Sequence, residues 1–113
     1  MAFNPRQNIT AGSGTTAGPF NILSAGDNAG DIKSINLANT HASNAATVNL
    51  YVYNNNSKVT AYIIKNVSIP SGVSLNLDLL NTNINTSLGQ DNVSIKVTQT
   101  DIANGGVDVI ISN

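Results

Sequence analysis

Short stretches in which apolar and polar side chains alternate recur along the chain, and the clearest is VSLNLDL at residues 73–79. Successive side chains of a β-strand point to opposite faces, so this pattern gives one dry and one wet face. Turn-forming groups such as GDNAG (26–30), NNNS (54–57), PSG (70–72) and NGG (104–106) separate the stretches, and no helical period is sustained. The sequence therefore predicts an all-β fold: a single antiparallel β-sandwich, jelly-roll or immunoglobulin-like, of about seven or eight strands.

Two positions depart from regular alternation and predict local irregularities. Ile32 is out of phase with Ile35 and Leu37, and a β-bulge near residues 33–34 would restore the phase. Lys65 falls on the apolar face of the stretch 58–69, so we expect it near an end or a bend of that strand. The turn at residues 54–57 is predicted to be a hairpin connection in which Asn adopts positive φ.

The length of 113 residues fits one domain with a single core. The segment AGSGTTA at residues 11–17 is too rich in small residues to predict a firm element. We therefore expect an N-terminal arm at residues 1–17 and a β-sandwich domain at residues 18–113. The arm is a candidate for ordering on a neighbouring molecule, with Phe3, Arg6 and Ile9 as possible interface residues; the alternative is a free tail.

The charge content argues against several classes of partner. Charged residues make up 10% of the chain, and five Lys or Arg oppose six Asp, for a net charge of −1. Such a chain lacks the field that steers proteins to nucleic acid or to anionic membranes, and it has no apolar run long enough to span a bilayer. The start of the chain has no secretory signal pattern, so synthesis and assembly in a cytoplasm are expected. A weakly charged surface resists self-association poorly, which favours a protein of an assembly, including a homo-oligomer.

The residues that could carry chemistry are few. The chain has no Cys, and its one histidine, His41, lies in a polar stretch and is interpreted as a solvated loop residue. Asp27 and Asp31 near one turn suggest calcium faintly, but they lack the spacing of a calcium loop, so we interpret them as turn-capping residues. No nucleophile elbow or phosphate loop is present. We expect no enzyme, no cofactor and no metal site.

Three tyrosines form the most specific functional hypothesis. Tyr51 and Tyr53 share one strand face, and Tyr62 comes to the facing strand if the turn at residues 54–57 is tight. Three interpretations remain open: cross-strand stabilisation of a hairpin, a subunit interface, and stacking on sugar rings.

The pattern as a whole resembles the small β-sandwich virion proteins of tailed bacteriophages. The stretches that carry the resemblance are INLANT (35–40), TVNLYV (47–52), IPSGVSL (69–75), QDNVSI (90–95) and VDVIIS (107–112), within residues 18–113. The resemblance implies a structural component of the virion and carries over no catalytic residue. Its partners would be the major capsid protein or other virion proteins.

Among virion roles, the expected one is a capsid decoration or cement protein that clamps neighbouring shell subunits. The alternatives are a neck, tail or fibre component and, from another class, a carbohydrate-binding β-sandwich module that uses the tyrosines.

Overall fold

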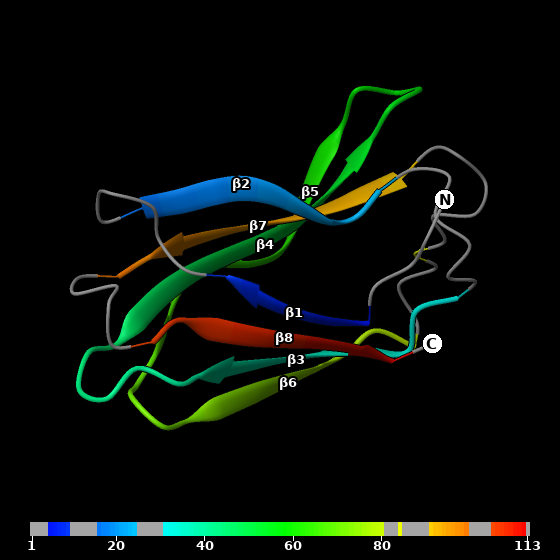
Figure 1. Cartoon of the computed structure of the whole chain (residues 1–113). Helices are drawn as coiled ribbons and strands as arrows, with labels where there is room; N and C mark the ends of the chain where they lie inside the picture. The colour runs from blue at the N-terminus through cyan, green and yellow to red at the C-terminus, as the bar shows by residue number, and fades with distance from the viewer. Residues whose placement is uncertain are drawn as a thin grey trace.

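The computed structural model describes residues 5–9, 16–24, 31–80, 84, 91–99 and 105–112. Strands are the regular elements of these residues, and they lie in two layers (Figure 1). Their bounds are β1 (Arg6–Ile9), β2 (Thr16–Leu23), β3 (Ser34–Asn39), β4 (Ala46–Asn54), β5 (Thr60–Ile69), β6 (Ser74–Asp78), β7 (Asp91–Thr98) and β8 (Val107–Ser112).

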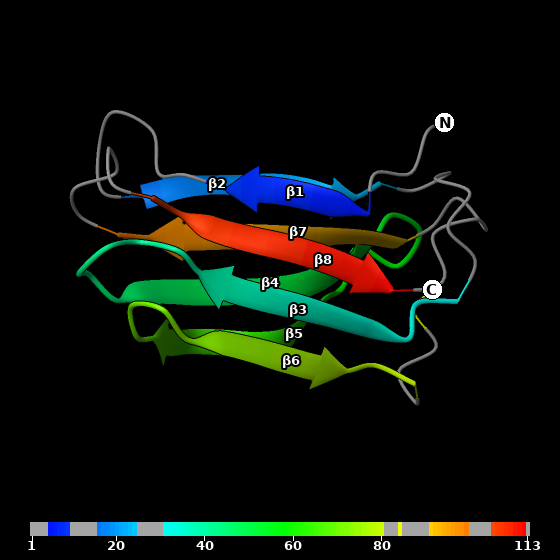
Figure 2. The ribbon, with the colours of Figure 1, turned by 60° about the horizontal axis from the view of Figure 1, so that its bottom comes forward.

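The strand order is that of a jelly roll. One sheet has the order β1-β8-β3-β6 and the other β2-β7-β4-β5, and every pairing is antiparallel (Figure 2). Strands that are adjacent in the sequence mostly change sheets, except for the hairpin of β4 and β5. The predicted all-β sandwich is confirmed, and of its two predicted forms the strand order matches the jelly roll.

The core lies between the two sheets and follows from the alternation. In β3, Ile35 and Leu37 are buried, whereas the alternating residues Ser34, Asn36 and Ala38 are half-buried. Val48 and Leu50 of β4, in the other sheet, are also buried and alternate with half-buried residues. Because most of the strands supply aliphatic side chains at every second position, the two inner faces interdigitate without needing aromatic residues. Other fully buried members are Leu23, Val93, Ile95, Val97, Val107 and Val109.

The predicted boundary at residue 17 is wrong for one segment of the arm. Residues Arg6–Ile9 form strand β1, which pairs with β8 in the register Arg6↔Ile110 to Ile9↔Val107. Ile9 is 7% exposed and belongs to the core. Gln7 Nε2 donates a 2.8 Å hydrogen bond to the Ile22 carbonyl of β2, so it ties the two sheets together at this side. The segment RQNI has a single apolar residue, so its sequence gives no alternation from which a strand could be predicted.

The predicted bend at Lys65 is confirmed. The pairing of β4 with β5 shifts register twice, between Val48/Leu50 and Leu50/Tyr51, and Asn66 has a φ of 53°. The Asn66 N–H donates a 2.9 Å hydrogen bond to Asn49 Oδ1 of β4. This irregularity places Lys65 on the exposed side of the strand, so its ammonium group stays outside the core.

The hairpin between β4 and β5 is also confirmed, with one correction. Asn54 Oδ1 accepts hydrogen bonds from the N–H groups of Asn56 and Ser57, both at 2.9 Å, which is how Asn stabilises a turn. The positive φ of this connection, however, belongs to Lys58, at 61°, and not to an Asn. Lys58 adopts it because its N–H donates to the Asn54 carbonyl and closes the turn.

Candidate interaction surface

The three tyrosines come together on the outer face of the sheet β2-β7-β4-β5. Tyr51 is paired with Tyr62 across β4 and β5, and their ring centroids are 5.3 Å apart at an interplanar angle of 51°. Tyr53 is two residues further along β4, on the same face and opposite Thr60. The inward side chains next to them, Val48 and Leu50, are in the core, so the rings rest on a packed sheet. This arrangement matches the sequence expectation.

Tyr62 is the most accessible of these rings. It is 50% exposed, whereas Tyr51 and Tyr53 are half-buried. The Lys65 Nζ lies 5.1 Å from the centroid of the Tyr62 ring, a distance at which an ammonium group is attracted to the π face. The Lys65 ammonium group therefore lies over the Tyr62 ring.

Small polar residues continue the surface across the sheet. In the register of the strands, Tyr51 is opposite Ser94 of β7, and Ser94 is opposite Asn21 of β2. Ser94 Oγ and Asn21 Oδ1 form a 2.6 Å hydrogen bond. We call the set Tyr51, Tyr53, Tyr62, Lys65, Ser94 and Asn21 the tyrosine face. Ser94 itself is only 5% exposed, so the groups available for contact with a polar partner surface are the tyrosine rings, the Lys65 ammonium group and the Asn21 amide.

Hydrogen bonds from the hairpin hold one end of the tyrosine face. Asn54 Nδ2 donates to Asp91 Oδ1 at 3.0 Å, and Asn92 Nδ2 donates to Asn55 Oδ1 at 3.0 Å. Both bonds join the turn after β4 to the start of β7, so the tip of the hairpin is anchored to a central strand. A surface fixed in this way loses little conformational entropy when it binds a partner.

The other predicted interface residues do not join the tyrosine face. Arg6 is exposed on β1 of the opposite sheet, where it pairs with Ile110. Ile9 is in the core and unavailable for an interface, which corrects that prediction. Phe3 lies outside the described residues, as does Asp27 of the turn considered for calcium.

His41 is not a solvated loop residue, contrary to prediction. It is 2% exposed, and its Nδ1 accepts hydrogen bonds from the N–H groups of Ser43 at 3.0 Å and Asn44 at 2.9 Å. Ser71 Oγ of the β5–β6 connection donates to the His41 carbonyl at 2.6 Å. The buried ring therefore stabilises the connection between β3 and β4 by accepting hydrogen bonds from two of its backbone N–H groups.

Two buried amides complete this polar cluster. Asn39 Nδ2 donates to the carbonyls of Asn44 and Ile69, both at 2.9 Å, and Asn39 Oδ1 accepts from the His41 N–H at 3.0 Å. Gln99 Nε2 donates to Asn39 Oδ1 at 3.0 Å and to the Asn44 carbonyl at 3.2 Å. Gln99 follows β7, so the cluster joins connections from both sheets. Sequence reasoning missed it, because its members are far apart in the chain.

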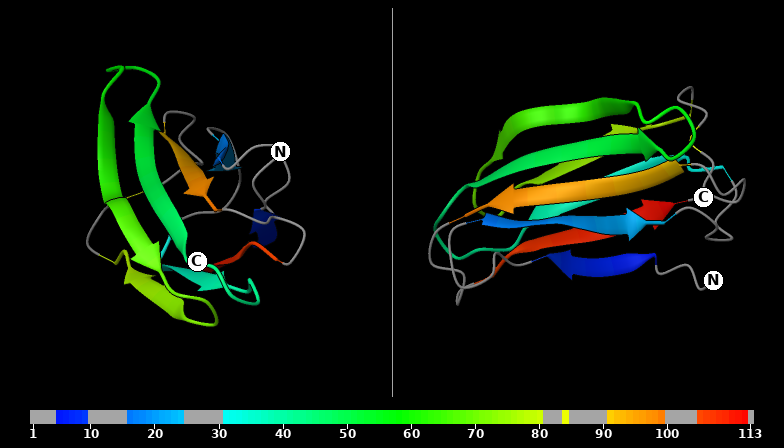
Figure 3. Two further views of the ribbon diagram at one scale, coloured as in Figure 1. Left: turned by 90° about the vertical axis from the view of Figure 1, so that its left-hand side faces the viewer. Right: turned by 90° about the horizontal axis from the view of Figure 1, so that it is seen from above.

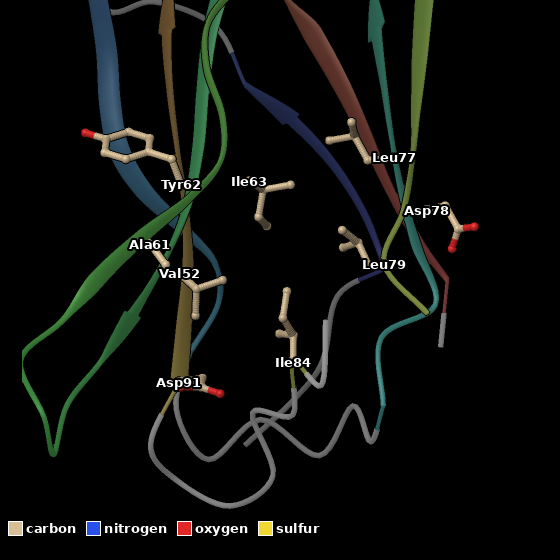
Figure 4. Close-up of a pocket in the computed structure, with 9 residues that line it drawn as sticks. All are labelled: Val52, Ala61, Tyr62, Ile63, Leu77, Asp78, Leu79, Ile84 and Asp91. Carbon is tan, nitrogen blue, oxygen red and sulfur yellow. The ribbon is translucent and has the colours of Figure 1, made fainter. Parts of the chain in front are cut away.

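Strands β5 and β6 lie at the same side of the two sheets (Figure 3), and residues of both line an apolar groove. Its volume is about 520 Å³. In Figure 4, Ile63, Leu77 and Ile84 point into it, whereas the Tyr62 ring and the Asp78 carboxylate point away. Val52, Ala61, Leu79 and Asp91 complete the lining. The groove depends on the spacing between the edges of two separate sheets, for which the sequence carries no signal.

The part of the chain that the structure describes contains neither a candidate metal cluster nor a candidate membrane-spanning helix. Among those residues, no group of three or more His, Cys, Asp or Glu is placed to hold a metal ion. No helix there is long and apolar enough to cross a membrane. The sequence matches no protein-family model and no curated protein.

Proposed function

We propose that this chain is a structural protein of a bacteriophage particle, and that it serves as a capsid decoration or cement protein that binds across neighbouring shell subunits. The observation that carries the proposal is the tyrosine face, in which the half-exposed Tyr62 ring lies tilted against the Tyr51 ring over a packed sheet. Tyrosine rings are favoured in protein interfaces because they bury a large rigid area and still offer a hydroxyl group. The jelly-roll order is also common in viral capsid domains, although a fold alone does not decide a function.

Binding to shells tests the proposal directly. Phage capsids without the protein are incubated with the purified chain, and bound protein is measured by cosedimentation. We expect Tyr62→Ala to weaken binding about tenfold or more, as for a central interface residue. Asn36→Ala is the matched control, because Asn36 lies in the other sheet, on β3. Equal binding of the two variants, or no binding of the unaltered chain, contradicts the proposal.

The copy number in purified particles separates the virion roles. A decoration protein covers the shell and is present on the order of hundreds of copies, whereas a neck or tail ring holds about six or twelve. Quantitative mass spectrometry of particles gives this number, and a low value would favour the neck, tail or fibre alternative.

A carbohydrate-binding role is the second candidate, and it rests on the same exposed ring. A half-exposed tyrosine with a cation and amide groups nearby can stack on a sugar and bind its hydroxyl groups. Glycan-array binding that is lost in Tyr62→Ala and in Tyr53→Ala would support this function. Binding to shells without binding to glycans would exclude the carbohydrate-binding role and favour the capsid-binding role.

A further inference from the structure

The four edge strands of the sandwich differ in how they are protected against pairing. Edges present unpaired backbone N–H and C=O groups, and proteins block them with short strands, proline, lysine or bulges. Strand β1 is four residues long and follows Pro5, and β2 contains Pro19 and two register shifts. Strand β5 carries Lys65 and the irregularity at Asn66. Each of these three edges has a device that hinders the addition of a strand.

Strand β6 is nearly as short as β1, with five residues, but it has none of the other devices. Its sequence, SLNLD, contains no proline and no lysine, and it pairs with β3 in an unbroken register. Its inward residues Leu75 and Leu77 are only half-buried, whereas their partners on β3, Leu37 and Ile35, are fully buried. Val73, just before the strand, is 45% exposed. Within the part of the chain that the structure describes, no strand pairs with the open side of β6, next to these apolar side chains.

The backbone of β6 shows which groups face that open side. The Asn39 N–H donates to the Val73 carbonyl at 3.0 Å, and the Leu79 N–H donates to the Lys33 carbonyl at 2.8 Å. In an antiparallel ladder, residues alternate between pointing their N–H and C=O groups to one neighbour and to the other. The groups of Val73 and Leu79 point to β3, so those of Ser74, Asn76 and Asp78 point to the free edge.

We propose that β6 pairs with β6 of a second copy of this chain, antiparallel and about a two-fold axis at Asn76. This register brings Ser74 opposite Asp78 of the partner subunit and Asn76 opposite its own copy, and each pair exchanges backbone hydrogen bonds. On the inner side, Leu75 lies beside Leu77 of the partner subunit. The half-buried leucines are then covered, and the two four-stranded sheets become one continuous sheet.

The charges on this edge are compatible with self-pairing. Asp78 is the charged residue of β6, and in this register it faces a serine and not a second aspartate. The two Asp78 residues lie at opposite ends of the paired strands, more than a Debye length apart at physiological salt. Lys65 of the neighbouring edge is held over the Tyr62 ring on the outer face. The net charge of −1 per chain adds little repulsion.

Disulfide trapping tests the register, because the chain contains no cysteine. Hydrogen-bonded partners in an antiparallel pair have Cα atoms about 5.5 Å apart, within the range that a disulfide spans. We expect Asn76→Cys to form a covalent dimer rapidly on mild oxidation. Asn36→Cys, on the adjacent strand of the same sheet and opposite Asn76, is the control and should stay monomeric. Equal cross-linking of the two variants would overturn the proposal.

The oligomeric state of the full chain provides the second test. Sedimentation equilibrium of the unaltered protein should show twice the monomer mass of 11.7 kDa. Asn76→Asp places two carboxylates on the axis and should shift the protein to monomer, whereas Asn76→Ser should remain dimeric. Circular dichroism confirms that each variant is folded. A monomeric mass for the unaltered chain at about 1 mM, the dissociation constant of a very weak complex, contradicts β6 pairing.

Discussion

Gly105 lies against the backbone of His41: a Cβ placed on Gly105 would come within 2.8 Å of the His41 Cα. Gly105 also has a φ of 130°, which other residues rarely adopt. The contact brings the connection before β8 against the one after β3, where the Thr40 N–H donates a 2.9 Å hydrogen bond to the Gly106 carbonyl. A side chain at position 105 would force these two connections apart.

Gly105→Ala should therefore lower the free energy of unfolding by about 2–4 kcal/mol, from strain and steric overlap together. Gly72→Ala is the control, since Gly72 has a φ of 74° but no atom within 4 Å of the added Cβ. It should cost only about 1 kcal/mol. Urea denaturation measures the free energy of unfolding of both variants. Equal decreases would show that the close approach of Gly105 to His41 does not contribute to the cost of the substitution.

His41→Ala should cost about 3 kcal/mol in unfolding free energy. The change removes a buried ring and leaves the N–H groups of Ser43 and Asn44 without their acceptor. In His41→Asn, the Oδ1 atom takes the place of Nδ1 along the side chain, so it can accept the same two bonds. We expect it to restore roughly half of the loss. If the two variants are equally unstable, the stabilisation comes from the ring's packing alone.

Gln99→Glu should destabilise the fold in a pH-dependent way. Gln99 is 2% exposed, and its Nε2 donates to Asn39 Oδ1 and the Asn44 carbonyl, so a carboxylate there would oppose two oxygen acceptors. Burial raises the pKa of the introduced carboxyl above its ordinary value of about 4.3. The loss should therefore be small at about pH 4 and grow to about 3 kcal/mol by about pH 8. Thr98→Glu, one residue earlier and exposed, should show no such dependence.

The sequence predicted those features that depend on local spacing. Alternation in stretches such as VSLNLDL predicted the strands, and the NNNS turn together with the positions of Tyr51 and Tyr62 predicted that these rings would meet. Lys65 on an apolar face predicted the irregularity at Asn66. In each case, a few neighbouring residues contain the whole signal.

Features that depend on distant segments were not predictable in this way. His41 looked solvated because its neighbours in the sequence are polar, yet it is buried in a cluster that includes Ser71 and Gln99. Residues 6–9 looked like part of an arm because their partner, β8, lies about a hundred residues later. The groove depends on the distance between two sheets. The burial of His41, the pairing of residues 6–9 with β8 and the groove all depend on tertiary contacts, which a local sequence pattern does not predict.

Lys58→Gly should stabilise the protein by about 0.5 kcal/mol. Lys58 has a φ of 61°, and relief of its left-handed strain outweighs the greater freedom that Gly gives to the unfolded chain. Ser57→Gly, at a position without positive φ, should instead destabilise by about 0.5–1 kcal/mol. Thermal unfolding compares the two, and a loss of stability in both would mean that the Lys58 side chain makes a compensating contribution.

The Tyr51–Tyr62 pair should have a coupling energy of about 0.5–1 kcal/mol in a double-mutant cycle of unfolding. The rings are 5.3 Å apart and tilted, but half of Tyr62 is exposed, which limits the contribution of their contact to the fold. The cycle uses Tyr51→Ala, Tyr62→Ala and the double variant. A coupling well above this range would mean that the pair exists mainly to stabilise the hairpin. A coupling within it leaves the exposed half of Tyr62 available for a partner, as the shell-binding proposal requires.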